Sequence, residues 1–311
     1  EVPMQIQFDE VISQLIIMTM IIIIGYIAKR WKIIGEVGEK DISRLVVNVT
    51  SPALIISSLS ISLDEKVSQN IIIVAIITIG LLLGSYVISS LLLRFKSYQE
   101  EERVIYHFSM IFGNVAFLGF PMCYALFGKE GLLYASVYSG IQDLFFWSLG
   151  VHILAKQGEK LKLKNVLNPC MSALIVGFLV LIFKISIPST IEKVLTSIGN
   201  ATIPLALMLV GSSFFNCKIS KSVLKQMVFP SIIKLLLIPL FGGLVLFLIP
   251  IPELLKYIML IELSMPCAAS SVVLTKNYGR DHVLASTVVM YMTGFSLLTI
   301  PIVISIINSL W

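Results

Sequence analysis

A few polar and ionisable side chains interrupt the long apolar runs of this sequence, and their types indicate ion or proton chemistry. Asp143 and Glu262 lie deep within such runs, and Gln142 directly precedes Asp143. An ionisable group at the centre of a bilayer costs roughly 2.5–3.5 kcal/mol on insertion scales, so it seldom occurs without a role. Buried acids of this kind can bind sodium or carry a proton. We therefore take Asp143 and Glu262 as candidates for coupling.

Gln142 and Lys234 complete this set of deep polar residues. Neighbouring residues on a helix point about 100° apart, so Gln142 and Asp143 are predicted to contact different partners. Lys234 lies near the end of its apolar run, and its long stem can carry the ammonium group out to the interface. A purely structural role is therefore favoured for Lys234.

Two apolar runs are broken near their middle by Gly, Asn, Ser and Pro: the first at residues 113–121 and the second at residues 264–271. Proline removes a backbone donor and frees a carbonyl, and such groups persist in a membrane only beside a cavity. A half-helix that begins at such a break points the positive end of its dipole at the midplane, which favours an anion. Ser264, ahead of Pro266, is predicted to cap the second half-helix.

The elements that must position these residues are membrane helices. Of the 311 residues 57% are hydrophobic and 13% are charged, and the mean hydropathy is +0.95. Charged residues make up about 25% of an ordinary soluble domain. This composition argues against a soluble enzyme, a nucleic-acid binder or a disulfide scaffold. We predict an all-α protein with ten membrane spans, at about residues 11–28, 42–61, 70–93, 104–127, 132–154, 166–184, 198–215, 227–249, 254–275 and 283–308.

The distribution of Lys and Arg predicts the orientation of the chain. Counted by alternate loops, 17 of the 23 Lys and Arg fall on one side and five on the other, and Lys234 lies inside a span. Basic loops are cytoplasmic, so both termini are predicted to lie outside an inner or plasma membrane. The first span follows acidic rather than basic residues and lacks a cleavage site, so we interpret it as a span and not as a signal peptide.

Two short motifs recur at nearly the same offset. Asn48-Val-Thr-Ser-Pro recurs as Asn200-Ala-Thr-Ile-Pro, 152 residues later, and Gly128-Lys-Glu recurs as Gly279-Arg-Asp, 151 residues later. The chain is therefore predicted to consist of two five-helix repeats, residues 1–155 and 165–311. Because each repeat has an odd number of spans, the second is inverted, and secondary transporters of this design bind substrate at the midplane.

Catalytic motifs were sought and not found: the sequence has no H-E-x-x-H, no G-x-S-x-G and no paired intramembrane aspartates. We expect no enzyme activity and no metal or cofactor, apart from coupling to sodium ions or protons. The four cysteines are widely spaced and are interpreted as small apolar fillers.

At its breaks the sequence resembles the auxin efflux carrier family, which includes the plant auxin exporters and many bacterial permeases. The resemblance covers the whole chain except the long cytoplasmic loop of many plant members, which here is only about residues 155–165. Two features depart from the plant pattern: Gly113 replaces a proline, and Asp143 has no acidic counterpart. The matching residues are Asn114, Gly119 and Pro121 in the fourth span; Pro266, Val273 and Tyr278 in the ninth; and Pro52, Gln142 and Asn168-Pro169 elsewhere.

The resemblance implies a scaffold of spans one, two, six and seven and a transport unit of spans three to five and eight to ten, which slides like an elevator. The broken spans four and nine would cross at the site. Asn114 would hold a substrate carboxylate, together with the half-helix N-termini around Val115 and around Pro266 and Cys267. Gln142 and Asp143 would support the crossing from behind.

We therefore expect a secondary transporter for a small organic anion, a carboxylate of the auxin type included, which works in the lipid bilayer as a homodimer. One alternative is a cation/proton antiporter that uses Asp143 and Glu262. A second is a membrane sensor that transports nothing. No partner of the nucleic-acid class is expected.

Overall fold

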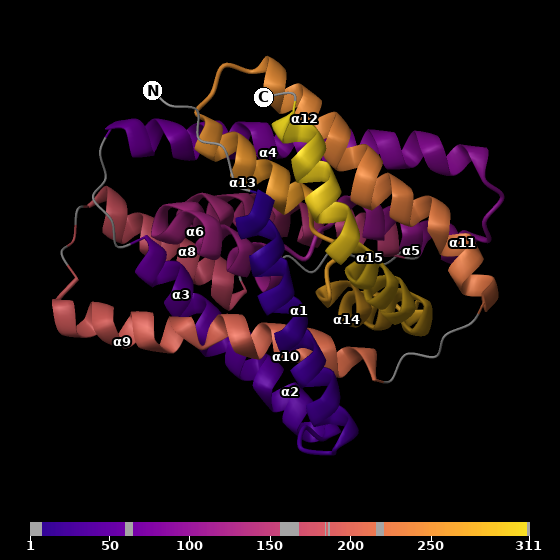
Figure 1. The fold of residues 1–311 in the computed structure, drawn as a ribbon, viewed down its shortest axis with the longest axis horizontal. Coiled ribbons are helices and arrows are strands. Elements are labelled where there is room, and N and C mark those ends of the chain that lie inside the picture. The colour runs from indigo at the N-terminus through magenta and orange to yellow at the C-terminus, as the bar shows by residue number, and fades with distance from the viewer. Residues whose placement is uncertain are drawn as a thin grey trace.

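The computed structural model describes residues 8–59, 65–155, 168–183, 185, 187–215 and 221–309, and these residues are almost entirely helical (Figure 1). Lys156, Lys160, Lys162, Lys164, Lys184 and Lys218, six of the cations used for the orientation, lie outside the described residues. The elements are α1 (Phe8–Arg30), α2 (Glu36–Leu45), η1 (Val46–Thr50), α3 (Ser51–Ser58), α4 (Glu65–Leu92), η2 (Leu93–Phe95), α5 (Glu100–Ile111), η3 (Val115–Gly119), α6 (Phe120–Phe145), η4 (Phe146–Gly150), α7 (Val151–Leu154), α8 (Pro169–Ile182), α9 (Ser189–Asn200), α10 (Thr202–Phe214), α11 (Lys221–Ile232), η6 (Ile233–Leu237), α12 (Ile238–Leu248), α13 (Glu253–Ser264), α14 (Ser270–Asn277) and α15 (His282–Asn308).

Within the described ranges, five helical stretches are long and apolar enough to cross a membrane: Val11–Arg30, Glu65–Phe95, Ser189–Phe214, Leu224–Leu248 and His282–Asn308. A shorter apolar helix is Pro169–Ile182. The predicted fourth and ninth spans fall outside this set because each is interrupted. The structure is thus that of a helical membrane protein, while the ten-span inverted repeat stays a prediction.

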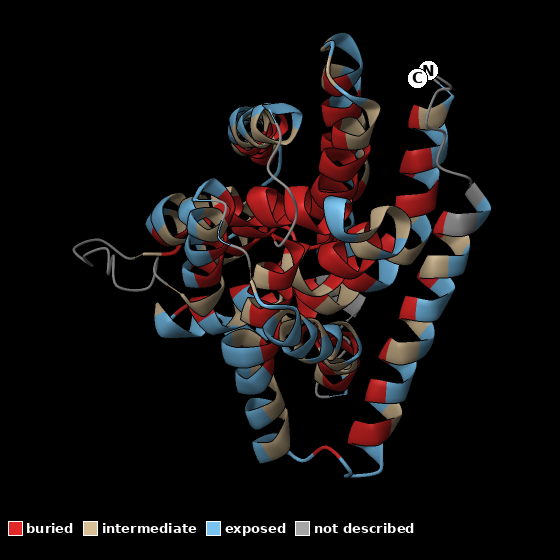
Figure 2. Cartoon of the chain, turned by 90° about the vertical axis from the view of Figure 1, so that its left-hand side faces the viewer, coloured by how far each residue is buried: buried red, intermediate tan, exposed pale blue. Residues whose placement is uncertain are grey.

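Helix α4 buries small polar residues together with aliphatic ones, while its exposed side is aliphatic, unlike the exposed side of a helix in a soluble protein. Its small polar residues pack inward, and branched residues about one turn apart face outward, as expected where the surroundings are lipid. Figure 2 shows the same mixture of buried and exposed faces along the outer helices. The inward residues include Asn70, Thr78, Ser85 and Ser89, and the outward residues include Ile72, Ile76, Leu83 and Val87.

Helices α1 and α10 cross at very short range because glycines lie at their contact. A Cβ atom on Gly25 would meet the backbone of Met208, and one on Gly211 would meet the backbone of Ile22. Small residues allow membrane helices to approach this closely. In Figure 1 α9 and α10 follow one another along the lower edge, and α1 crosses α10 there. The predicted first and seventh spans therefore pack together, although they come from different halves of the sequence.

The two predicted breaks are confirmed. Helix α5 ends at Ile111 and η3 begins at Val115, while α13 ends at Ser264 and α14 begins at Ser270. The residues between them, 112–114 and 265–269, are called the crossover segments below. The prediction for Ser264 is wrong: it is the last residue of α13, its hydroxyl donates to the carbonyl of Leu260 at 2.7 Å, and the N-cap of α14 is Ala269.

The echoed glycines have nearly the same positive φ angle. Gly128 has φ of 61° and Gly279 has φ of 59°, in the left-handed region that favours glycine. The cation after each joins a distant element: Lys129 pairs with Glu192 at 3.0 Å, and Arg280 pairs with Glu101 at 2.8 Å. Arg280 also donates to the carbonyl of Leu154 at 2.9 Å.

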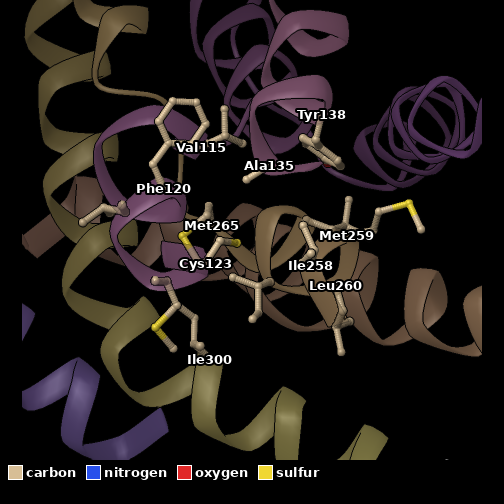
Figure 3. Close-up of a cluster of buried hydrophobic side chains, with 14 of the residues drawn as sticks. Val115, Phe120, Cys123, Ala135, Tyr138, Ile258, Met259, Leu260, Met265 and Ile300 are labelled. Atoms are coloured by element: carbon tan, nitrogen blue, oxygen red, sulfur yellow. The ribbon is translucent and has the colours of Figure 1, made fainter. Parts of the chain in front are cut away.

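The core lies where η3, α6, α13 and α15 meet beside the crossover segments. Figure 3 shows part of it, with Phe120, Cys123 and Tyr138 of α6 facing residues 258–260 of α13, and with Met265 between them. All of these side chains are buried. This packing fixes the first turn of the helix that starts at Val115 against the second broken span.

Candidate functional site

The two crossover segments pair like a minimal antiparallel sheet. Gly113 and Cys267 lie opposite one another. The amide of Asn114 donates to the carbonyl of Pro266 at 2.6 Å, and the amide of Ala268 donates to the carbonyl of Phe112 at 3.0 Å. These bonds flank the facing pair, so the N–H and C=O of Gly113 point away from the partner segment. In a membrane both groups need another partner.

Gln142 supplies that partner. Its Oε1 accepts from the amide of Gly113 at 3.1 Å, and its Nε2 donates to the carbonyl of Gly113 at 2.9 Å. The side-chain amide thus makes the two hydrogen bonds that a neighbouring strand would make to Gly113. Gln142 supports the crossover, as the resemblance implied, and both ends of its amide are engaged.

A cavity of about 190 Å³ lies beside the crossover. It is called the crossover cavity below. It is smaller than the roughly 300–1,000 Å³ of pockets that hold drug-sized ligands, so its size fits a small molecule. Elements from both predicted halves contribute to it. The lining residues are Val47, Ser51, Gly113, Asn114, Val115, Ala116, Phe117, Phe120, Ser139, Gln142, Asp143, Phe146, Trp147, Asn168, Cys170, Ala268 and Ser270.

Asn114 lies where a helix begins at the cavity. It is the N-cap of η3, which continues into α6, and its carbonyl accepts from the amides of Leu118 and Gly119. The first turn of a helix leaves its N–H groups without helical partners, and the first three residues of η3 line the cavity. The side chain of Asn114 is 5% exposed, and its Nδ2 has no acceptor among the described residues. A buried donor therefore lies next to a helix N-terminus.

The second half-helix reaches the same cavity through Ala268 and Ser270. Pro266 and Cys267, two predicted site residues, contribute no lining. Pro266 instead offers its carbonyl to the crossover, and the thiol of Cys267 is buried 3.4 Å from the hydroxyl of Ser271. Helix α14 begins beyond Cys267 because residues 266–268 pair with the other crossover segment.

Asp143 faces the cavity and is held by a residue that sequence reasoning did not place in the site. Its Oδ2 accepts from Nδ2 of Asn168 at 3.0 Å, and Oδ1 of Asn168 accepts from the amide of Met171 at 2.8 Å. Asn168 is thus the N-cap of α8, with Pro169 at the first helical position. The prediction that Gln142 and Asp143 contact different partners is confirmed. The Asn-Pro pair was the available signal for Asn168, but its contact with Asp143 arises only in the fold.

Glu262 is fully buried on α13 and does not line the crossover cavity. The thiol of Cys123 donates to its Oε1 at 3.5 Å, and its Oε2 has no partner in the described part of the chain. A Cβ atom on Gly119 would collide with this carboxyl group. Glu262 therefore lies on the side of η3 away from Asp143, and the structure does not bring the two acids together.

Lys234 does not reach the interface, contrary to the structural role expected from its long stem. It is fully buried in η6, and its ammonium donates to the carbonyl of Leu263 at 3.4 Å. That carbonyl belongs to the last turn of α13, where a cation is stabilised by the negative end of the helix. The broken ninth span thus provides a partner at depth that an uninterrupted helix would lack.

Among the residues that the structure describes, no group of three His, Cys, Asp or Glu side chains converges as metal ligands. The ionisable side chains near the crossover instead have separate partners: Asp143 contacts Asn168, Glu262 contacts Cys123, and Lys234 contacts the carbonyl of Leu263.

Comparison with known proteins places the sequence among membrane transporters. A family model described as membrane transport protein matches residues 10–166 and 158–304. An uncharacterized transporter of Methanothermobacter thermautotrophicus is 27% identical over 289 residues, which span 91% of this chain and 94% of that protein. An uncharacterized transporter of Methanocaldococcus jannaschii is 30% identical over 312 residues, which span 92% of this chain and 96% of that protein. The chain therefore belongs to the membrane transport protein family, the auxin efflux carrier family that its broken spans resemble.

Proposed function

We propose that this chain is a secondary transporter that moves a small organic anion with a carboxylate group. The observation that carries the proposal is the buried, unpartnered Nδ2 of Asn114 at the N-terminus of the helix that starts at Val115. A carboxylate in the crossover cavity would accept from this amide and from the free N–H groups of the first turn. The positive end of the helix dipole would add to the attraction.

Alternating access is supported by an asymmetry around the crossover. In the predicted orientation the 190 Å³ cavity lies toward the cytoplasm, because Trp147 and Asn168 lie near cytoplasmic helix ends. The hollow toward the outer ends, between α1, α6 and α15, measures only about 10 Å³. That volume is close to the smallest that holds one water molecule. A substrate would thus reach the site from the inside in this state.

An elevator motion is supported by how the helices associate. Helix α1 packs on α10, and α3 packs on α8 and α9, which groups the predicted scaffold. Helix α6 packs on α4 and α13, and α12 packs on α13, which groups the predicted transport unit. Both crossover segments belong to the second group. A sliding transport unit would therefore carry the site with it.

The first test measures carboxylate binding to the purified chain by thermal shift at millimolar ligand. Asn114→Ala should weaken binding about 10- to 100-fold, because a hydrogen bond to a charged group contributes about 1.5–3 kcal/mol. Asn114→Asp, which has the same shape and adds a negative charge, should abolish it. Asn200→Ala is the matched control at an exposed position outside the cavity lining. Unchanged binding in both Asn114 variants would remove this residue from the site.

The second test measures flux in proteoliposomes. Uptake of a radiolabelled carboxylate that binds the purified chain would support transport, and it would exclude a sensor that transports nothing. Sodium/proton exchange through Asp143 and Glu262 has less support, because Glu262 lies outside the cavity. Proton movement driven by a sodium gradient, with no carboxylate present, would favour the exchanger instead.

A further inference from the structure

The charged side chains that line the crossover cavity indicate which charges the substrate carries besides a carboxylate. Among the described residues that line the cavity, Asp143 is the only acid, and none is Lys, Arg or His. In the described part of the chain no cationic side chain forms an ion pair with Asp143. A substrate with only a carboxylate would therefore share a small cavity with a second carboxylate that has no cationic partner among the described residues.

The position of Asp143 is fixed by the fold. Asn168 holds one carboxylate oxygen and is itself held by the amide of Met171. Asp143 also follows directly after Gln142, whose amide is bonded to both backbone groups of Gly113. Asp143 therefore follows the residue that holds Gly113, and Asn114 follows Gly113 itself on the same crossover segment. Both residues line the crossover cavity.

The polar side chains beside Asp143 offer few free oxygen ligands to a bare metal ion. Hard cations take several oxygen ligands in proteins. The carbonyl oxygens of the Gln142 and Asn168 side chains already accept backbone N–H groups, and their amide nitrogens are donors. Aromatic rings are plentiful by comparison: Phe146 and Trp147, three and four residues after Asp143, line the cavity, as do Phe117 and Phe120. A carboxylate among aromatic faces is the chemistry that binds an organic ammonium group.

We propose that the substrate is a small zwitterion of the amino-acid class, with its carboxylate at Asn114 and its ammonium group at Asp143. This inference rests on the proposed function, since Asn114 must hold the carboxylate. It narrows the substrate class from organic anions in general to those that carry their own cation. The cavity volume of about 190 Å³ accommodates a molecule of that size.

The test compares matched ligands on the full-length purified chain by thermal shift and competition. One series is leucine, its deaminated carboxylate 4-methylpentanoate and its decarboxylated amine 3-methylbutylamine, and the same trio is made for each of the smaller apolar amino acids. At least one zwitterion should bind about a hundredfold more tightly than its matched carboxylate, because one partner of a buried charge pair would otherwise be unpaired. Replacing sodium chloride with potassium chloride tests whether carboxylate binding requires sodium in place of the ammonium group.

Substitutions then separate the two ends of the ligand. Asp143→Asn should remove the preference for the zwitterion and bring the carboxylate to equal or tighter binding, whereas Asn114→Ala should weaken both. Asp41→Asn is the control: the same chemical change at an exposed position that does not line the cavity. Because the ligand preference of the unmodified chain is decisive by itself, poor folding of Asp143→Asn does not remove the test.

The possible outcomes distinguish failure of the zwitterion inference from failure of the proposed function. Equal binding of zwitterion and carboxylate, both sensitive to Asn114→Ala, overturns the zwitterion inference and leaves the proposed function standing. Carboxylate binding that requires sodium overturns it also, in favour of an inorganic cation at Asp143. Absence of any shift across the trios contradicts the proposed function, and the zwitterion inference with it.

Discussion

Gln142→Met is the sharpest test of how the crossover is held. The substitution keeps side-chain length and removes the donor and the acceptor that satisfy Gly113, at 2.9 and 3.1 Å. Both Gly113 groups would then be buried without partners. Each orphaned group costs about 1–3 kcal/mol, which gives a loss of about 2–6 kcal/mol in the free energy of unfolding.

Membrane-helix measurements give a lower figure, about 0.6 kcal/mol per interhelical hydrogen bond, because the unfolded chain in the membrane finds other partners. We expect the higher range here. The groups left behind belong to a non-helical segment inside the protein, where no helical hydrogen bond replaces the lost partner. Binding at the adjacent Asn114 should weaken as well, since the crossover positions it.

The measurement is equilibrium unfolding in mixed detergent micelles with increasing denaturing detergent, followed by circular dichroism. Gln226→Met is the matched control, because its side chain is exposed and its contact with Tyr98 uses only the backbone carbonyl. The control should change stability by about 0.5 kcal/mol or less. A loss below about 1 kcal/mol for Gln142→Met, close to the control, would refute the claim that this amide holds the crossover.

Three further predictions follow from packing and charge. Arg280→Ala should lower the free energy of unfolding by about 1.5–3 kcal/mol, because the buried guanidinium donates to a carboxylate and a carbonyl. The control Arg44→Ala removes an exposed ion pair and should lower it by about 0–1 kcal/mol. Equal losses for the two variants would contradict this reasoning. Gly211→Ala should destabilise the protein because the added Cβ meets the backbone of α1. In the control Gly84→Ala the added Cβ meets open space, so stability should not fall. The melting temperatures of the two variants test this difference. Lys234→Met should leave stability unchanged or higher, because apolar replacement of a buried charge avoids its desolvation, and a marked fall in melting temperature would show that its bond to α13 outweighs that cost.

The helical membrane fold and the two broken spans could be predicted because their signals are local. Apolar runs stopped by charge mark the spans, and Gly, Asn and Pro near the middle of a run mark a break wherever the chain folds. Asn114 as the start of a half-helix follows from the same local rule. Ser264 shows its limit: a Ser ahead of Pro266 is a good local cap, but residues 266–268 pair with the other crossover segment, and the helix begins only at Ser270.

The partners of the polar residues could not be predicted, because they come from distant positions in the chain. Asp143 meets Asn168, and Glu262 meets Cys123, which is 139 residues away. Lys234 was expected to extend to the interface, and it instead ends at a carbonyl that only a broken ninth span exposes. Each contact depends on which helices pack together, and the apolar pattern of a span does not encode that choice.

By itself, the sequence determined that this protein is a helical membrane protein with two broken spans, because hydropathy and helix breaking are properties of short stretches of chain. The tertiary structure decided that Asp143 shares a cavity with Asn114, that Glu262 does not, and that Gln142 holds Gly113. The physical reason is that a buried polar group must find its partner in space, and in lipid the nearest suitable group lies on whichever helix packs beside it.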